Sequence, residues 1–142
     1  MEAVSLGVSE FQSPQELLKY IDSVLNDLRR KLGELLRQIE DLRARSERSE
    51  RLLRIISSLA GGGGQPTAGE TVIEIEKVKI YVNPTPKSEL EVLESIAEAI
   101  NAKITRLHNI RRGLEKLVES GVDTPVRVVF EDYIPKAIII KL

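Results

Sequence analysis

Cysteine and tryptophan are absent from the 142 residues, and the chain has only one methionine and one histidine. Without cysteine there is no disulfide framework, zinc–thiolate site or iron–sulfur cluster. The single histidine, His108, excludes a metal site built from two histidines of one chain. No run of 18 apolar residues occurs, so the sequence predicts no membrane-spanning helix and no membrane partner.

Neither sign of charge dominates, because 21 basic and 22 acidic residues give a net charge of -1. This balance argues against a globally basic nucleic-acid-binding domain. The N-terminal residues 1–12 lack the basic start and the apolar stretch of a signal peptide, so we expect a cytoplasmic protein. Abundant glutamate and arginine without cysteine is typical of heat-adapted proteins and suggests a thermophilic source.

Aromatic residues make up only 4% of the chain, and the apolar residues are mostly leucine, isoleucine and valine. In the first half they follow one another in alternating steps of three and four, which predicts a coiled-coil helix over residues 13–60. Ser13, Pro14 and Glu16 form the start signal of this helix: the hydroxyl of Ser13 can accept a hydrogen bond from the amide of Glu16, and Glu16 can reach back to the amide of Ser13. The predicted seam consists of Leu18, Ile21, Leu25, Leu28, Leu32, Leu35, Ile39, Leu42, Leu53 and Ile56.

The length of this helix bears on how the chain assembles. About 47 residues at ~1.5 Å each extend roughly 70 Å, whereas a compact domain of this size measures about 40 Å across. The seam must therefore meet another long helix, either residues 86–120 folded back or the same helix of another subunit. We expect self-association into a homodimer or larger oligomer, because an uncovered apolar stripe would lower solubility.

The second half predicts a small β-α-β-β domain over residues 71–142, joined to the helix by a glycine-rich linker, residues 61–70. Residues 71–82 alternate as a strand, but the alternation slips at Glu76-Lys77, which indicates a bulge or a short turn. A second helix follows over residues 86–120, begun by Thr85 or by Ser88 with Glu91, and Ser120-Gly121 closes it.

Residues 126–130 and 137–142 predict two further strands. Pro135 argues against a two-residue turn between them, and the apolar last strand is expected at the centre of the sheet. A right-handed crossover then makes the first two strands parallel, with strand order 1-3-2. One face of the sheet, which includes Val78, Ile80 and Val82, is expected to pack on the second helix. Residues 1–12 supply an edge strand or stay disordered. The predicted fold class is α+β.

Basic residues gather in two places, and we name them as candidate contacts to an anionic partner. In the first place, Arg43, Arg51 and Arg54 can instead pair with Glu47 or Glu50 four positions away on the same helix. In the second, basic residues near the end of a helix complement the helix dipole. Arg111 stands out, because it falls on an apolar stripe and must either pair with a carboxylate or extend its stem to solvent. The candidates are Arg43, Arg45, Arg48, Arg51, Arg54, Arg106, His108, Arg111 and Arg112.

No catalytic, cofactor-binding or metal-ligating set emerges from these residues. The four glycines at 61–64 follow a helix and precede a strand, which is the reverse of a phosphate-binding loop. We therefore expect a non-enzymatic scaffold or adaptor that binds itself and another protein. The alternative is a nucleic-acid-binding module that aligns its arginine-rich clusters on a dimer.

Overall fold

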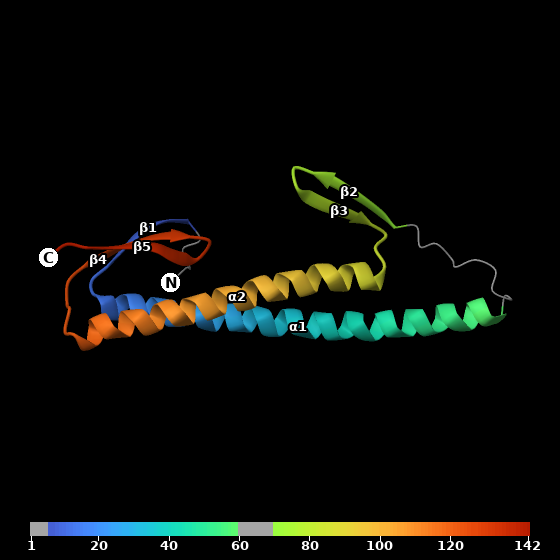
Figure 1. Cartoon of the computed structure of the whole chain (residues 1–142), viewed down its shortest axis with the longest axis horizontal. Helices are drawn as coiled ribbons and strands as arrows, with labels where there is room; N and C mark the ends of the chain where they lie inside the picture. Colours follow the sequence, from blue (N-terminus) through green and yellow to red (C-terminus); the bar gives the residue numbers. More distant parts are fainter. Residues whose placement is uncertain (1–5, 60–69) are drawn as a thin grey trace. The chain divides into compact units, whose positions relative to one another are not determined.

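The computed structural model describes residues 6–59 and 70–142, and it has an α+β fold with two helices and two small antiparallel sheets (Figure 1). The predicted linker falls outside the described residues except for Glu70. No helix in the described ranges is long and apolar enough to cross a membrane. The elements are β1 (Leu6–Phe11), α1 (Pro14–Leu59), β2 (Thr71–Ile75), β3 (Val78–Val82), α2 (Pro86–Glu119), β4 (Val126–Glu131) and β5 (Ile134–Ile140).

The chain divides into two compact units. Unit 1 comprises residues 1–33 and 99–142, and unit 2 comprises residues 34–98. Unit 1 therefore holds the start of α1, the end of α2 and the sheet of β1, β4 and β5, which we call sheet A. Unit 2 holds the rest of both helices and the β2–β3 hairpin.

The start of α1 shows the predicted cap with one difference. The hydroxyl of Ser13 accepts a hydrogen bond from the amide of Glu16 at 3.3 Å, as expected. The carboxylate of Glu16, however, accepts a hydrogen bond from the amide of Gln12 at 2.8 Å, one residue before the amide we predicted. Both bonds satisfy amides at a helix end, where no backbone partner exists.

Helix α2 begins and ends as the sequence predicts. The hydroxyl of Thr85 accepts a hydrogen bond from the amide of Ser88 at 3.1 Å, which selects Thr85 as the cap. At the other end Gly121 has a φ of +80°. The amide of Val122 donates to the carbonyl of Leu117 at 3.3 Å and the amide of Gly121 to that of Val118 at 3.1 Å. These two bonds form a Schellman motif, which favours glycine.

The core of unit 1 lies between sheet A and the two helices. Val126, Val128 and Phe130 alternate along β4 and point inward, fully buried. Phe130 also joins Phe11 and Tyr20 in an aromatic cluster with ring centroids 5.3 to 6.3 Å apart. Such edge-on and tilted contacts add to the burial energy. Three of the five aromatic residues of the chain thus lie in one core.

The first turns of α1 bury a wider stripe than a coiled coil needs. Leu17, Tyr20 and Val24 are buried in addition to the seam residues beside them. A helix that contacts only one other helix buries a narrow stripe, whereas one that packs on a sheet as well buries a broad one. In unit 1 this segment therefore packs as part of a layered core, and a coiled coil is not established.

The predicted strand order 1-3-2 is wrong. Sheet A has the order β1-β4-β5 and is antiparallel throughout, with β4 at its centre. Residues 71–82 do not join it, because they turn at Glu76-Lys77 and pair with themselves as β2 and β3. Instead β1 pairs with β4 and forms one edge of sheet A, so β4 takes the central place that we gave to the last strand. No parallel crossover is then needed.

The connection between β4 and β5 also differs from our prediction. Asp132 and Tyr133 form a two-residue turn, with φ of 54° and 67°. Pro135 does not prevent this turn, because it lies inside β5 opposite Phe130, where the register shifts. A proline is tolerated at such a bulge, since the ladder lacks a hydrogen bond there. Strand β5 is an edge strand, so the expectation that it lies at the centre is wrong as well.

Candidate protein-interaction site

The β2–β3 hairpin of unit 2 is built around an unusual turn. Glu76 and Lys77 have φ of 50° and 66°. Glycine adopts such positive φ values readily, whereas L-residues other than asparagine rarely do. Positive φ at both central residues is typical of the type I′ turn, whose twist matches the right-handed twist of the two strands of a hairpin. The β-branched residues on both sides of the turn favour strands. Their preference outweighs the poor fit of Glu76 and Lys77 to the turn.

One face of this hairpin is entirely aliphatic apart from Thr71. In the register, Ile73 pairs with Ile80 and Ile75 pairs with Val78. The other face carries the pairs Val72–Tyr81 and Glu74–Lys79. We call the first face the apolar face. It consists of Ile73, Ile75, Val78, Ile80 and Val82, which are between 41% and 62% exposed.

A two-stranded hairpin with such a face is not expected to be stable on its own. Isolated hairpins of two strands are marginal in water, and sheets need a third strand or a packed face. If each of the five side chains gains about half of the roughly 1.5–3 kcal/mol of full burial, covering the face contributes on the order of 5 kcal/mol. That is comparable with the whole stability of a small domain.

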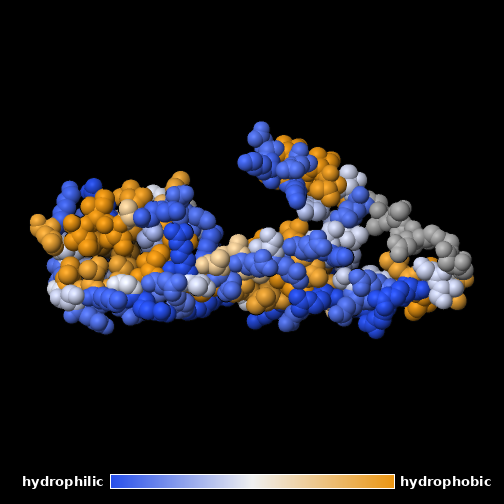
Figure 2. All heavy atoms as spheres, in the orientation of Figure 1, coloured by the Kyte–Doolittle hydropathy of each residue, from blue (hydrophilic) through white to orange (hydrophobic). Residues whose placement is uncertain are grey.

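Apolar side chains are also exposed at the C-terminal end of α1, in the same unit. Leu52, Leu53, Ile55, Ile56 and Leu59 are between 42% and 83% exposed. Figure 2 shows apolar side chains (orange) at the surface both of the hairpin and of this end of α1. Clusters of exposed apolar side chains mark interaction sites, whereas single exposed apolar residues are normal on a protein surface.

A groove of about 550 Å³ lies next to the end of α1. Leu52 and Leu53 of α1 line it together with the segment from Asn83 to Lys87, which includes two prolines. Ser46 and Ser49, the two small polar residues that interrupt the predicted seam, line it as well. The small side chains thus leave room in unit 2 where larger seam residues would fill it.

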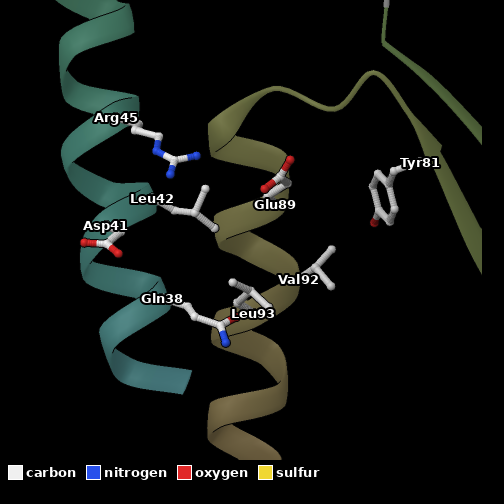
Figure 3. A pocket seen from close by; sticks show the side chains of 8 residues that line it. All are labelled: Gln38, Asp41, Leu42, Arg45, Tyr81, Glu89, Val92 and Leu93. Carbon is white, nitrogen blue, oxygen red and sulfur yellow. The ribbon is translucent and has the colours of Figure 1, made fainter. Parts of the chain in front are cut away.

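A second pocket, of about 400 Å³, lies between the two helices and β3 (Figure 3). Figure 3 shows Arg45 of α1 and Glu89 of α2 directed toward one another above Leu42, with Tyr81 facing α2 across the gap. The lining mixes charged groups with an apolar floor.

The structure uses most of the predicted seam within the chain. Leu18, Ile21, Leu25 and Leu28 belong to the core of unit 1, and Leu32 packs against that core. In unit 2, Ile39 and Leu42 are buried and Leu35 is half-buried, whereas Leu53 and Ile56 are exposed. Arg43 of α1 and Glu94 of α2 form an ion pair at 3.2 Å in that unit. Within each unit the buried part of the seam thus packs beside α2, and self-association through the seam stays a prediction.

Several of the candidate anion-binding residues have partners. Arg54 pairs with Glu50 at 3.8 Å, and the ring of His108 forms a hydrogen bond with Arg29. Within residues 6–59 and 70–142, no carboxylate lies at ion-pair distance from the remaining candidates. These are Arg45, Arg48, Arg51, Arg106 and Arg112, all of them exposed.

Arg111 pairs across the helices of unit 1. Its Nε donates to Asp22 Oδ1 at 2.5 Å and its Nη2 donates to Oδ2 at 3.2 Å, while Nη1 donates to Glu115. Hydrogen bonding to Asp22 raises the pKa of Arg111 above its ordinary value, and partial burial opposes the shift. Of the two interpretations, pairing with a carboxylate is the one found, and Asp22 is a partner the sequence did not single out.

The apolar face is the feature that sequence reasoning placed wrongly. We expected Val78, Ile80 and Val82 to pack on the second helix, but they are exposed. The signal was present in the slip at Glu76-Lys77. A two-residue turn pairs odd positions of one strand with even positions of the other, so Ile73 and Ile75 share a face with Val78 and Ile80.

Comparison with protein-family models, with curated proteins and with solved structures found no match. The function is therefore inferred from the residues of this chain.

Proposed function

We propose that the chain is a non-enzymatic protein-interaction module, a scaffold or adaptor, that binds through unit 2. Its binding surface is the apolar face of the hairpin with the exposed end of α1 beside the groove. One observation carries the proposal. A two-stranded sheet, marginal by itself, exposes five aliphatic side chains on one face and keeps its charged pair, Glu74 and Lys79, on the other.

The chemistry of this surface favours a protein partner. Protein interfaces combine an apolar centre with a polar rim, and here the charged residues Glu76 and Lys77 of the turn directly follow Ile75 and precede Val78 of the apolar face. Single-stranded nucleic acids are bound on aromatic platforms within basic grooves. The apolar face has no aromatic residue, and residues 71–82 carry two glutamates and two lysines, a net charge of zero.

The alternative, a nucleic-acid-binding module, rests on a different observation. Arg45, Arg48 and Arg51 of α1 are exposed, and in the described part of the chain no carboxylate neutralises them. Binding by such residues falls steeply with salt, because each phosphate contact releases counterions. Fluorescence anisotropy with a labelled oligonucleotide at several salt concentrations tests it. Saturable binding with a steep slope that Arg48→Gln reduces would favour this alternative.

Site-specific photo-crosslinking in the cells that make the protein tests the proposed function. A benzophenone amino acid replaces Val78 on the apolar face, and the matched control carries it at Val72 on the opposite face, which is similarly exposed. We expect discrete protein adducts from position 78 and few from position 72. Equal yields of diffuse adducts from both positions would contradict a binding role for the apolar face.

A further inference from the structure

We propose that the partner covering the apolar face is a second copy of this chain, with the two hairpins packed face to face. The inference rests on the proposed function and names its partner. Two β-sheets pack in this way at a spacing of about 10 Å, with side chains from the two inner faces interdigitating. The contact is isologous, so each copy presents Ile73, Ile75, Val78, Ile80 and Val82 to the same residues of the other.

The apolar face suits a copy of itself. It carries no charged residue, so a two-fold contact brings no like charges together and leaves no charge buried without a partner. Glu74 and Lys79 are cross-strand neighbours on the opposite face and compensate one another. With a net charge of zero for residues 71–82 and -1 for the whole chain, two copies repel one another only weakly.

Packing of the faces explains the exposed residues better than pairing of strand edges does. Strands β2 and β3 are the only members of their sheet among the described residues, so both outer edges are open. Joining two hairpins through an edge would extend the sheet, but all five aliphatic side chains would still face water. Face-to-face packing covers them at once and leaves the charged faces in solvent.

The size of the contact sets the expected affinity. A standard stable interface involves roughly 20–30 residues on each side, whereas the apolar face supplies five residues and the end of α1 five more. We therefore expect a dimer that forms and dissociates with concentration, with a dissociation constant in the range of about 1–100 µM.

Sedimentation equilibrium of the full chain from about 1 µM to about 500 µM tests the proposal. The wild type should rise from the 15.9 kDa of one chain toward twice that mass. Val78→Lys places a charge in the contact and should weaken dimerisation at least about 10-fold. Val72→Lys makes the same change on the opposite face and should weaken it less than about 3-fold. Circular dichroism verifies that both variants keep their helices.

A second pair of variants keeps the test valid if the Val78→Lys substitution unfolds the hairpin. Val78→Cys and Val72→Cys each introduce the only cysteine of the chain, and a short bis-maleimide reagent should join two copies through position 78 far more than through position 72. A monomer at every concentration, or equal effects at both positions, would overturn the proposal. A monomer that still forms discrete adducts with other proteins in cells would leave the proposed function standing while this inference falls.

Discussion

Arg111 lies where the apolar stripe of α2 calls for an aliphatic side chain, and Asp22 on α1 accounts for its presence. The pair is bidentate and partly shielded, since the side chain of Arg111 is 30% exposed and that of Asp22 is 45% exposed. Bidentate arginine–carboxylate pairs combine energy with geometric specificity. The pair therefore helps to set the register of the two helices within unit 1.

Asp22→Asn is expected to lower the free energy of unfolding by about 1 kcal/mol, because it removes the charge from a partly exposed pair. Arg111→Met should cost a similar amount, and the double variant should cost less than the sum of the two. Urea unfolding of all four proteins measures this coupling. Additive losses would show that the two side chains act independently.

Replacing glycine by alanine is expected to have opposite effects on stability at two positions, Gly113 and Gly121. A Cβ added to Gly113 or to Gly121 would meet no other atom within 4 Å, but only Gly121 has a positive φ, +80°. Gly113→Ala should stabilise the protein by about 0.5–1 kcal/mol, because alanine favours the interior of a helix. Gly121→Ala should destabilise it by about 1 kcal/mol, because the left-handed conformation is strained for any residue with a Cβ. Thermal unfolding distinguishes the signs, and a gain for Gly121→Ala would contradict the Schellman cap.

At the scale of whole elements, sequence patterns predicted the helices well and the strands only in part. Helix starts depend on local side chains such as Ser13 and Thr85, which the sequence displays directly. Strand pairing depends on distant residues. Two tight turns were hard to identify. A bulge or a short turn stayed open at Glu76-Lys77 and the turn at Asp132-Tyr133 was missed, because both pairs lack the asparagine and glycine that usually indicate such turns. At both turns the strand-forming residues on either side outweigh the low preference of the two central residues for a turn.

The turn of the β2–β3 hairpin offers a direct test of this override. Glu76→Asn with Lys77→Gly replaces two strained residues by the pair that this turn favours, and should stabilise the hairpin by about 1 kcal/mol. Hydrogen exchange of the β2 and β3 amides reports the local effect, while amides of sheet A serve as the internal control. Faster exchange in β2 and β3 would mean that the turn has a different conformation.

The seam of α1 shows what periodicity leaves open. It revealed which residues need cover but not which helix supplies it. Leu25 is buried in unit 1 and Leu53 is exposed. Leu25→Ala should therefore cost about 2–5 kcal/mol, whereas Leu53→Ala should change the stability of the isolated chain by less than about 1 kcal/mol. Equal losses, measured by urea unfolding at low protein concentration, would indicate that Leu53 is covered within the chain.

At the scale of the whole molecule, the two units differ in how completely they bury their apolar residues. Unit 1 has a continuous core of aliphatic and aromatic side chains. In unit 2, Ile39, Leu42 and Ala97 are buried, while the hairpin and the end of α1 remain exposed. The sequence indicated self-association through the helix seam. The structure leaves Leu53 and Ile56 of that seam exposed and shows a second exposed apolar surface on the hairpin, which the periodicity of α1 could not have revealed.

Hydrogen exchange of the hairpin as a function of protein concentration tests the central claim most directly, that a second copy covers the apolar face. The amides of β2 and β3 should exchange rapidly at about 1 µM and become markedly protected at about 500 µM, while those of β4 stay protected throughout. Protection that is high and equal at both concentrations would show that the hairpin is stable without a second copy, and would contradict the claim.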